Sequence, residues 1–150
     1  ARARAAGAAT ISLSCNPDAP MSAAADLAIE VVTGPEVLTG STRLKAGTAQ
    51  KLVLNMLSTA TMVKLGKTYS NLMVDVQPTN AKLRQRAARI VAEIIGASPD
   101  DARILLEQAG WEVKTATVMG LAGVDATEAR RRLHAHRGRV RAAVGDEVRG

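Results

Sequence analysis

The chain has 150 residues, enough for one domain, or a domain and a small appendage, with a buried core. Its net charge of +6 and pI of about 10.1 make nucleic-acid binding an alternative to consider, but aromatic residues make up only 1% and offer no platform for base stacking. The single cysteine, Cys15, excludes an intrachain disulfide and suits a reducing compartment. No apolar run reaches the ~20 residues of a membrane helix, and the basic start lacks the apolar segment of a secretory signal.

The beginning of the chain predicts two strands of a parallel sheet. Residues before Gly7 have the pattern of a helix end, and residues 8–14 (AATISLS) predict a buried strand. A turn-rich loop and a short helical turn over 21–25 then lead to a second strand over 26–32. This order is typical of parallel α/β sheets, in which ligand loops follow the carboxyl ends of strands. We expect Cys15, at the first strand's end, to be a buried thiol rather than a nucleophile.

A tight loop that opens into a long helix follows the second predicted strand. Apolar residues at helical spacing predict this helix over about 42–67, and Ser41 and Thr42 are good N-cap residues. Free backbone N–H groups, the two hydroxyls and the cations Arg43 and Lys45 would make an anion site there. A simple helix cap is the alternative interpretation. The glycine spacing does not match the phosphate loop of nucleotide-binding proteins.

The second half of the chain predicts a helical bundle. An extended or irregular segment over 69–76 contains Asp75, which we expect to be structural, and the pattern from residue 79 onward is wholly helical. Ser98-Pro99 and Asp125 are strong helix starts, and glycines end most helices. The division into two domains is therefore placed at 1–78 and 79–150. The expected helices are 80–95, 98–110, 112–121, 125–136 and 140–144.

Two features near the C-terminus could suggest a ligand site. His134 and His136 are two positions apart, so on a helix they point roughly 200° from each other, and we expect no metal site. Six arginines follow one another closely over 130–141. We expect them to form a solvated face with counter-charges such as Glu128 and Asp146, and nucleic-acid binding is the alternative.

Two stretches carry a resemblance to a known family. They are G-P-E-V-L-T-G-S-T-R-L-K-A-G-T-A-Q-K-L-V-L-N-M-L-S-T (34–59) and K-L-G-K-T-Y-S-N-L-M-V-D-V (64–76). Together they resemble the signature of the N-acetylmuramic acid 6-phosphate etherases, which belong to the sugar isomerase (SIS) domain proteins and are related to the glucokinase regulatory protein. The resemblance runs nearly without a gap from about residue 8 to 80, and more loosely to about 144. It implies an α/β fold: the C-terminal half of a SIS-type parallel-sheet domain in 1–78, then a small helical bundle similar to ubiquitin-associated modules in 79–150.

The resemblance also implies an activity. These enzymes are carbon–oxygen lyases that cleave the D-lactyl ether of N-acetylmuramic acid 6-phosphate, giving N-acetylglucosamine 6-phosphate and D-lactate in the recycling of cell-wall sugars. Lactate is eliminated from the open-chain sugar and water then adds, with no metal or organic cofactor. The expected protein is a cytoplasmic homodimer whose partner is an amino-sugar 6-phosphate, with neither nucleic acid nor membrane as a partner.

The chain matches only part of this family's pattern. The phosphate loop and the two glutamates assigned as acid and base belong to a first half that these residues do not contain, so we expect a chain that is incomplete and inactive alone. No catalytic residue is assigned. Glu36 matches the family's loop glutamate and is a hydroxyl-contacting or polarising candidate. The resemblance implies substrate binding by Glu36, Ser41, Thr42 and Lys45. The alternatives are a non-catalytic sugar-phosphate-binding regulator and a basic nucleic-acid-binding protein.

Overall fold

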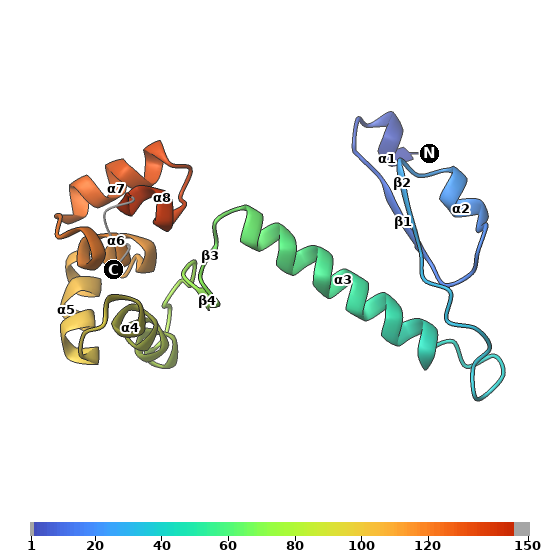
Figure 1. Cartoon of the computed structure of the whole chain (residues 1–150), viewed down its shortest axis with the longest axis horizontal. Helices are drawn as coiled ribbons and strands as arrows, with labels where there is room; N and C mark the ends of the chain where they lie inside the picture. Colours follow the sequence, from blue (N-terminus) through green and yellow to red (C-terminus); the bar gives the residue numbers. More distant parts are fainter. Residues whose placement is uncertain (1, 146–150) are drawn as a thin grey trace. The chain divides into compact units, whose positions relative to one another are not determined.

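The computed structural model describes residues 2–145 and divides the chain into two compact units, Ala1–Thr59 and Ala60–Gly150. Each unit is described by itself. Both helices and a parallel pair of strands are present, which confirms the mixed α/β class (Figure 1). The predicted domain division at residue 78 stays a prediction.

The first unit contains the predicted strand, crossover and strand. Ile11 pairs with Leu27 and Ser14 with Glu30, and the two strands run parallel. The crossover includes one short helix, which begins at a proline, a favourable first residue for a helix because its fixed φ suits it. The elements before the long helix are α1 (Arg2–Ala5), β1 (Ile11–Ser14), α2 (Pro20–Ala23) and β2 (Leu27–Glu30).

The first unit has no apolar core of its own. Among residues 2–59 the buried side chains are Ser12 and Ser14, whereas Ile11 and Leu27 are 55% and 53% exposed. The expectation of a buried strand over 8–14 is therefore wrong for its apolar residues. Successive strand side chains point to opposite faces, and here the serines take the covered face. Cys15 is half-buried rather than buried.

The long helix α3 (Lys45–Lys64) is shorter than predicted at both ends. Residues 42–44 form a turn before it, and Gly66 ends it with a left-handed φ of 71°. None of its side chains is buried, and Leu52, Leu54 and Met56 are all more than half exposed.

A small hairpin follows α3, in a segment for which only an extended or irregular path was predicted. β3 (Thr68–Tyr69) and β4 (Leu72–Met73) pair antiparallel. Ser70, the first residue of the connecting turn, has a φ of 51°. The Val74 amide donates to the Lys67 carbonyl, which extends the pairing, and the Val74 side chain is buried in the core of the second unit.

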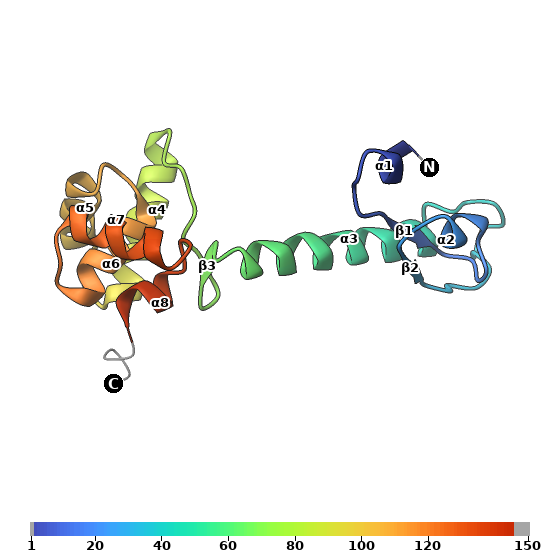
Figure 2. The same cartoon turned by 90° about the horizontal axis from the view of Figure 1, so that it is seen from above.

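Five helices complete the second unit, close to their predicted bounds (Figure 2). The side chains of Asn80, Ser98 and Asp125 each accept a hydrogen bond from a first-turn amide of the following helix, as expected of N-caps. Gly96 and Gly123 end two helices in the left-handed conformation. The helices are α4 (Ala81–Ile95), α5 (Pro99–Gln108), α6 (Val113–Ala122), α7 (Ala126–Ala135) and α8 (Val140–Val144).

The core of the second unit consists of small and medium aliphatic residues. Leu106, Val91 and Val118 are completely buried, with several alanines between them. Small residues let the helices pack closely: a Cβ added to Gly120 on α6 would lie 2.7 Å from Cγ2 of Ile95 on α4. The absence of Phe is thus compensated by close helix packing rather than by large side chains.

Candidate functional site

A hollow of about 270 Å³ in the first unit lies where the sequence analysis places a ligand loop. Four segments line it: the carboxyl end of β1, Met21 of α2, the loop after β2 and the start of α3. This is the edge at which open parallel sheets bind ligands. The polar side chains that line the hollow are those of Ser14, Cys15, Asn16, Thr33, Glu36, Thr42 and Gln50.

Glu36 caps the long helix. Its two carboxylate oxygens accept hydrogen bonds from the backbone amides of Lys45 at 2.9 Å and Ala46 at 3.0 Å. These donors, Ala46 first, and the charge of Lys45 hold the pKa of the Glu36 carboxyl below its ordinary value. Glu36 is therefore ionised at neutral pH, and it is the anion that occupies the positive end of α3.

This arrangement corrects the predicted cap and the predicted free amides. The capping acceptor comes from Glu36, nine residues before the helix, and not from the hydroxyls of Ser41 or Thr42. The first three amides of α3 already have acceptors. Those of Lys45 and Ala46 donate to Glu36, and that of Gly47 donates to the Thr42 carbonyl. A ligand anion at this place would have to contact side chains, or displace Glu36.

The predicted substrate-binding residues are only partly brought together. Glu36 and Thr42 both line the hollow. Ser41 is half-buried, and its amide donates to the Leu38 carbonyl in the preceding turn. Lys45 is exposed, and its Nζ would lie 3.8 Å from a Cβ added to Gly34, at the rim of the same loop.

The sequence analysis missed the contribution of the segment after β1. The Cys15 thiol donates to the Ala46 carbonyl at 3.5 Å, so the end of β1 touches the first turn of α3. The Ser14 hydroxyl accepts from the Asn16 amide and donates to the Asn16 carbonyl, which fixes the turn. The signal that could have found these residues is their place at the carboxyl end of a parallel strand.

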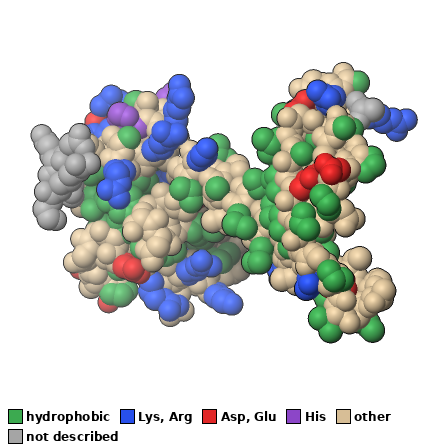
Figure 3. Space-filling model, turned by 45° about the vertical axis from the view of Figure 1, so that its right-hand side comes forward, with side chains coloured by type: hydrophobic (Ala, Val, Ile, Leu, Met, Phe, Trp, Pro, Cys, Tyr) green, Lys and Arg blue, Asp and Glu red, His purple; other side chains and the backbone are tan. Residues whose placement is uncertain are grey.

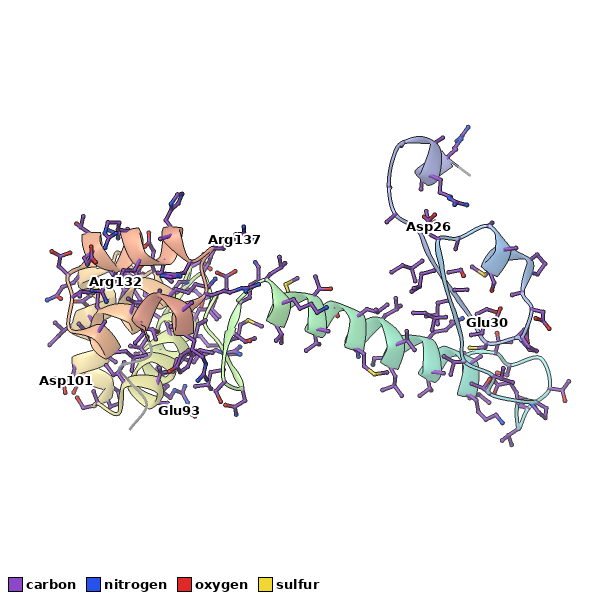
Figure 4. The ribbon with its side chains drawn as sticks, turned by 45° about the horizontal axis from the view of Figure 1, so that its top comes forward. Asp26, Glu30, Glu93, Asp101, Arg132 and Arg137 are labelled. Atoms are coloured by element: carbon purple, nitrogen blue, oxygen red, sulfur yellow. The ribbon has the colours of Figure 1, made fainter. Side chains whose placement is uncertain are left out.

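Two other carboxylates in the first unit hold its loops (Figure 4). Glu30, at the end of β2, accepts hydrogen bonds from the Ser22 hydroxyl and from the amides of Asp18 and Ala19. These bonds lower the pKa of the Glu30 carboxyl, and the bond from Ser22 has the largest effect. Asp26 accepts from the amide and hydroxyl of Thr10 and pairs with Arg4 at 2.8 Å. These contacts fix the crossover between β1 and β2.

In the second unit, Asp75 bridges two lysines. Its carboxylate lies 2.6 Å from Lys67 Nζ and 3.2 Å from Lys114 Nζ, and the hydrogen bond from Lys67 is the main cause of its lowered pKa. Asp75 thus links the segment after the hairpin to α6, in keeping with the structural role expected of it.

The arginine run divides into a paired and an unpaired part. Arg130 pairs with Glu112 at 2.9 Å, and Arg131 and Arg132 both pair with Glu128, which lowers the pKa of Glu128 to about 2. Glu128 is therefore a counter-charge, as expected, while the other predicted counter-charge, Asp146, lies outside the described residues.

Neither a metal-binding cluster nor a membrane-spanning helix occurs in the part of the chain that the structure describes. No group of three or more His, Cys, Asp or Glu side chains there could hold a metal ion. His134 lies in the last turn of α7 and His136 follows that helix. None of the described helices is long and apolar enough to cross a bilayer.

Comparisons with known proteins extend the resemblance over the chain. N-acetylmuramic acid 6-phosphate etherases of Serratia proteamaculans and Mycolicibacterium smegmatis are 60% identical over 142 residues and 61% over 143 residues, and that of Salmonella agona is 56% identical over 142 residues. These alignments cover 95% of this chain and 48% of each relative, so the chain spans about half the length of the curated relatives it matches. No family model matches. The resemblance predicted from residues 34–59 and 64–76 is confirmed.

Proposed function

We propose that this chain is part of an N-acetylmuramic acid 6-phosphate etherase, a carbon–oxygen lyase that cleaves a D-lactyl ether to release D-lactate and N-acetylglucosamine 6-phosphate. One observation carries the proposal: 56–61% identity to proteins of that name over 95% of the chain. The substrate is an amino-sugar 6-phosphate, and the reaction needs no cofactor.

The hollow at the end of β1 supplies this chain's share of the substrate site. We assign substrate binding to Glu36, Ser41, Thr42 and Lys45. Thr42 offers a hydroxyl on the wall of the hollow, and Lys45 offers a positive charge at its rim. A sugar phosphate fits such a site because hydroxyl and ammonium donors bind phosphate oxygens.

We assign Glu36 a binding and positioning role and not that of a catalytic base. A base that abstracts a proton needs a pKa near the working pH, whereas two amide donors hold the pKa of Glu36 low. Its carboxylate fixes the loop that carries Ser41 and Thr42 against the start of α3. The catalytic acid and base then belong to the half of the enzyme that this chain does not span.

The proposal includes the finer architecture expected from the resemblance. Residues 1–78 form part of a SIS-type parallel-sheet domain, and residues 79–150 form a helical domain similar to a ubiquitin-associated module. The parallel pair of β1 and β2, followed by the ligand loop, supports the first part. The three short helices α6, α7 and α8 support the second. The assembled enzyme is a cytoplasmic homodimer.

D-lactate release from N-acetylmuramic acid 6-phosphate tests the proposal. The chain is assayed alone and after co-folding with the segment of the Serratia proteamaculans relative that it does not cover. We expect release only from the mixture, and at least a tenfold lower rate when the mixture carries Ser41→Ala and Thr42→Ala. Arg89→Ala, an exposed change on α4, is the matched control and should leave the rate unchanged.

Three outcomes would change the assignment. Release by the chain alone would place the acid and base within these 150 residues. A folded mixture that binds the sugar phosphate without releasing lactate would favour the regulator. An unchanged rate in the Ser41 and Thr42 variant would remove those residues from the site.

A further inference from the structure

The unpaired part of the arginine run consists of Arg137, Arg139 and Arg141. Within residues 2–145 no carboxylate forms an ion pair with any of these three guanidinium groups, in contrast to Arg130, Arg131 and Arg132. Arginine remains charged at any physiological pH. The positive charges of Arg139 and Arg141 therefore lie close together at the start of α8, and no carboxylate of the described residues pairs with them.

The neighbouring hairpin and helix end hold both side chains in place. Arg139 Nη2 donates to the carbonyl of Lys64, the last residue of α3, at 3.3 Å. The Arg141 guanidinium lies over the Tyr69 ring, 5.4 Å from its centroid. A Cβ added to Gly66 would lie 2.8 Å from Arg139 Cγ, so a residue without a side chain is needed at this contact. The two guanidinium groups are thus positioned before any ligand arrives.

A hollow of about 350 Å³ opens beside these groups. Its wall includes Arg139, Arg141 and Lys64, and also Thr68 and Ser70 of the hairpin. A second hollow, of about 480 Å³, is lined by the same two arginines together with Ala142 and Gly145. Among residues 2–145, which the structure describes, no acidic residue lines either hollow. Figure 3 shows Lys and Arg side chains gathered on the visible face of this unit, with few acidic side chains among them.

We propose that the hollow between the hairpin and α8 is a binding site for a small phosphate monoester. Guanidinium groups bind phosphate oxygens through paired, charge-assisted hydrogen bonds. Arg139 uses one of its donors on Lys64, and Arg141 uses its ring face on Tyr69, so most of their N–H groups are available. The hydroxyl groups of Thr68 and Ser70 can form hydrogen bonds with polar groups on the part of the ligand that is esterified to the phosphate.

The size and composition of the site favour a small molecule over a nucleic acid. Small-molecule pockets have volumes of roughly 300–1,000 Å³, and this hollow falls at the lower end of that range. Nonspecific nucleic-acid binding uses a longer track of cations and, for single strands, aromatic side chains. Here Arg130, Arg131 and Arg132 are paired with Glu112 and Glu128, which offset two of their three charges.

The residues of this site differ from those of the proposed substrate site, and the proposal does not rest on the proposed function. Residues that line the hollow fall between Val63 and Arg141, in the second unit, whereas Ser41 and Thr42 belong to the first unit. Variants of the two groups therefore distinguish the two sites.

Binding is measured on the 150-residue chain by titration calorimetry in a phosphate-free buffer. The probes are inorganic phosphate and glucose 6-phosphate, with glucose as the neutral control. The chain carries Ser41→Ala and Thr42→Ala, so that the proposed substrate site does not contribute. We expect both phosphates to bind and glucose not to, with amide NMR shifts confined to the hairpin and the start of α8.

Changes at the two arginines complete the test. Arg139→Lys with Arg141→Lys keeps the charge but loses the paired hydrogen bonds, and should weaken binding at least tenfold with the melting temperature unchanged. Arg139→Ala with Arg141→Ala should abolish binding. Arg86→Ala with Arg89→Ala, on exposed positions of α4, is the matched control and should leave affinity unchanged.

Three results would overturn the proposal. The first is phosphate binding that is unchanged in both double variants of Arg139 and Arg141, the lysine pair and the alanine pair. The second is binding that disappears with Ser41→Ala and Thr42→Ala alone, which would assign all phosphate affinity to the first unit. The third is tight, steeply salt-dependent binding of a 12-base-pair duplex together with no response to either phosphate, which would make the patch a nucleic-acid surface.

Discussion

Leu106→Ala tests whether the stability of this chain resides in the core of residues 60–145. Leu106 on α5 is completely buried among small aliphatic residues. Replacing a fully buried leucine with alanine costs about 2.7–5 kcal/mol, from lost transfer energy and the cavity left behind. The closely packed helices cannot collapse far into such a cavity, so we expect a cost in the upper part of this range, about 4 kcal/mol. For a domain of this size, that lowers the melting temperature by roughly 16–32 °C.

The assay is urea unfolding followed by the fluorescence of Trp111, the only tryptophan in the chain and a residue packed against this core. Ile104→Ala is the control, because Ile104 lies on the same helix but is 54% exposed; its cost should stay below about 1 kcal/mol. Equal losses for the two variants would refute the placement of the core. So would a loss below about 1 kcal/mol for Leu106→Ala.

Four further predictions concern the acidic residues and the first unit. Glu36→Ala should unwind the first turn of α3, seen as faster hydrogen exchange of the Ala46 amide; unchanged exchange would contradict the cap. Asp75→Asn should lower stability by about 1–3 kcal/mol, because it leaves the largely buried Lys114 ammonium without its partner, and urea unfolding measures this. The pKa of Glu128 is lowered to about 2 from an ordinary 4.5, so its contribution to stability is complete above about pH 4.5 and is lost as the pH falls toward 2. The melting-temperature difference between wild type and Glu128→Gln should therefore be constant from pH 7 to 5 and shrink below that; a difference that grows on acidification would reverse the sign. Finally, amides of β1 and β2 should exchange much faster than those of α4–α6, because residues 2–59 bury no apolar side chain; equal protection would mean that another surface covers this unit.

The helices of the second unit could be predicted because their signals are local. Asn80, Ser98 and Asp125 bond to amides three residues later, and Gly96 and Gly123 stop the helices directly. Such contacts are visible as short patterns in the sequence. The predicted bounds were therefore within a few residues of those observed.

The start of α3 and the hairpin could not be predicted in the same way. The cap of α3 comes from Glu36, across a loop whose path the sequence does not show, and hydroxyls at Ser41 and Thr42 offered a nearer but wrong candidate. The hairpin turn has Ser70 at its positive-φ position, where glycine or asparagine is the usual signal.

The sequence predicted where the candidate site lies, but not all of the residues that line it. The loop after β2 was expected to follow a strand end, and Glu36 and Thr42 do line the hollow. Asn16 and Gln50 also line it, and they meet only because β1 pairs with β2 and α3 packs back against the end of β1. Contacts between segments this far apart in the sequence carry no short-range pattern.

The bond between Glu36 and the start of α3 closes the intervening residues 37–44 into a ring. The two ends of this ring are fixed, so its length can change without moving the helix. Lengthening a flexible loop is inexpensive, since each doubling costs only about 0.6 kcal/mol, and Val37 is 93% exposed, with room outside it. Because Ser41 and Thr42 sit on the ring itself, insertions would shift their hydroxyls while the scaffold stayed unchanged. Insertions in residues 37–44 would therefore change the shape of this edge while leaving the pairing of β1 with β2 and the start of α3 in place.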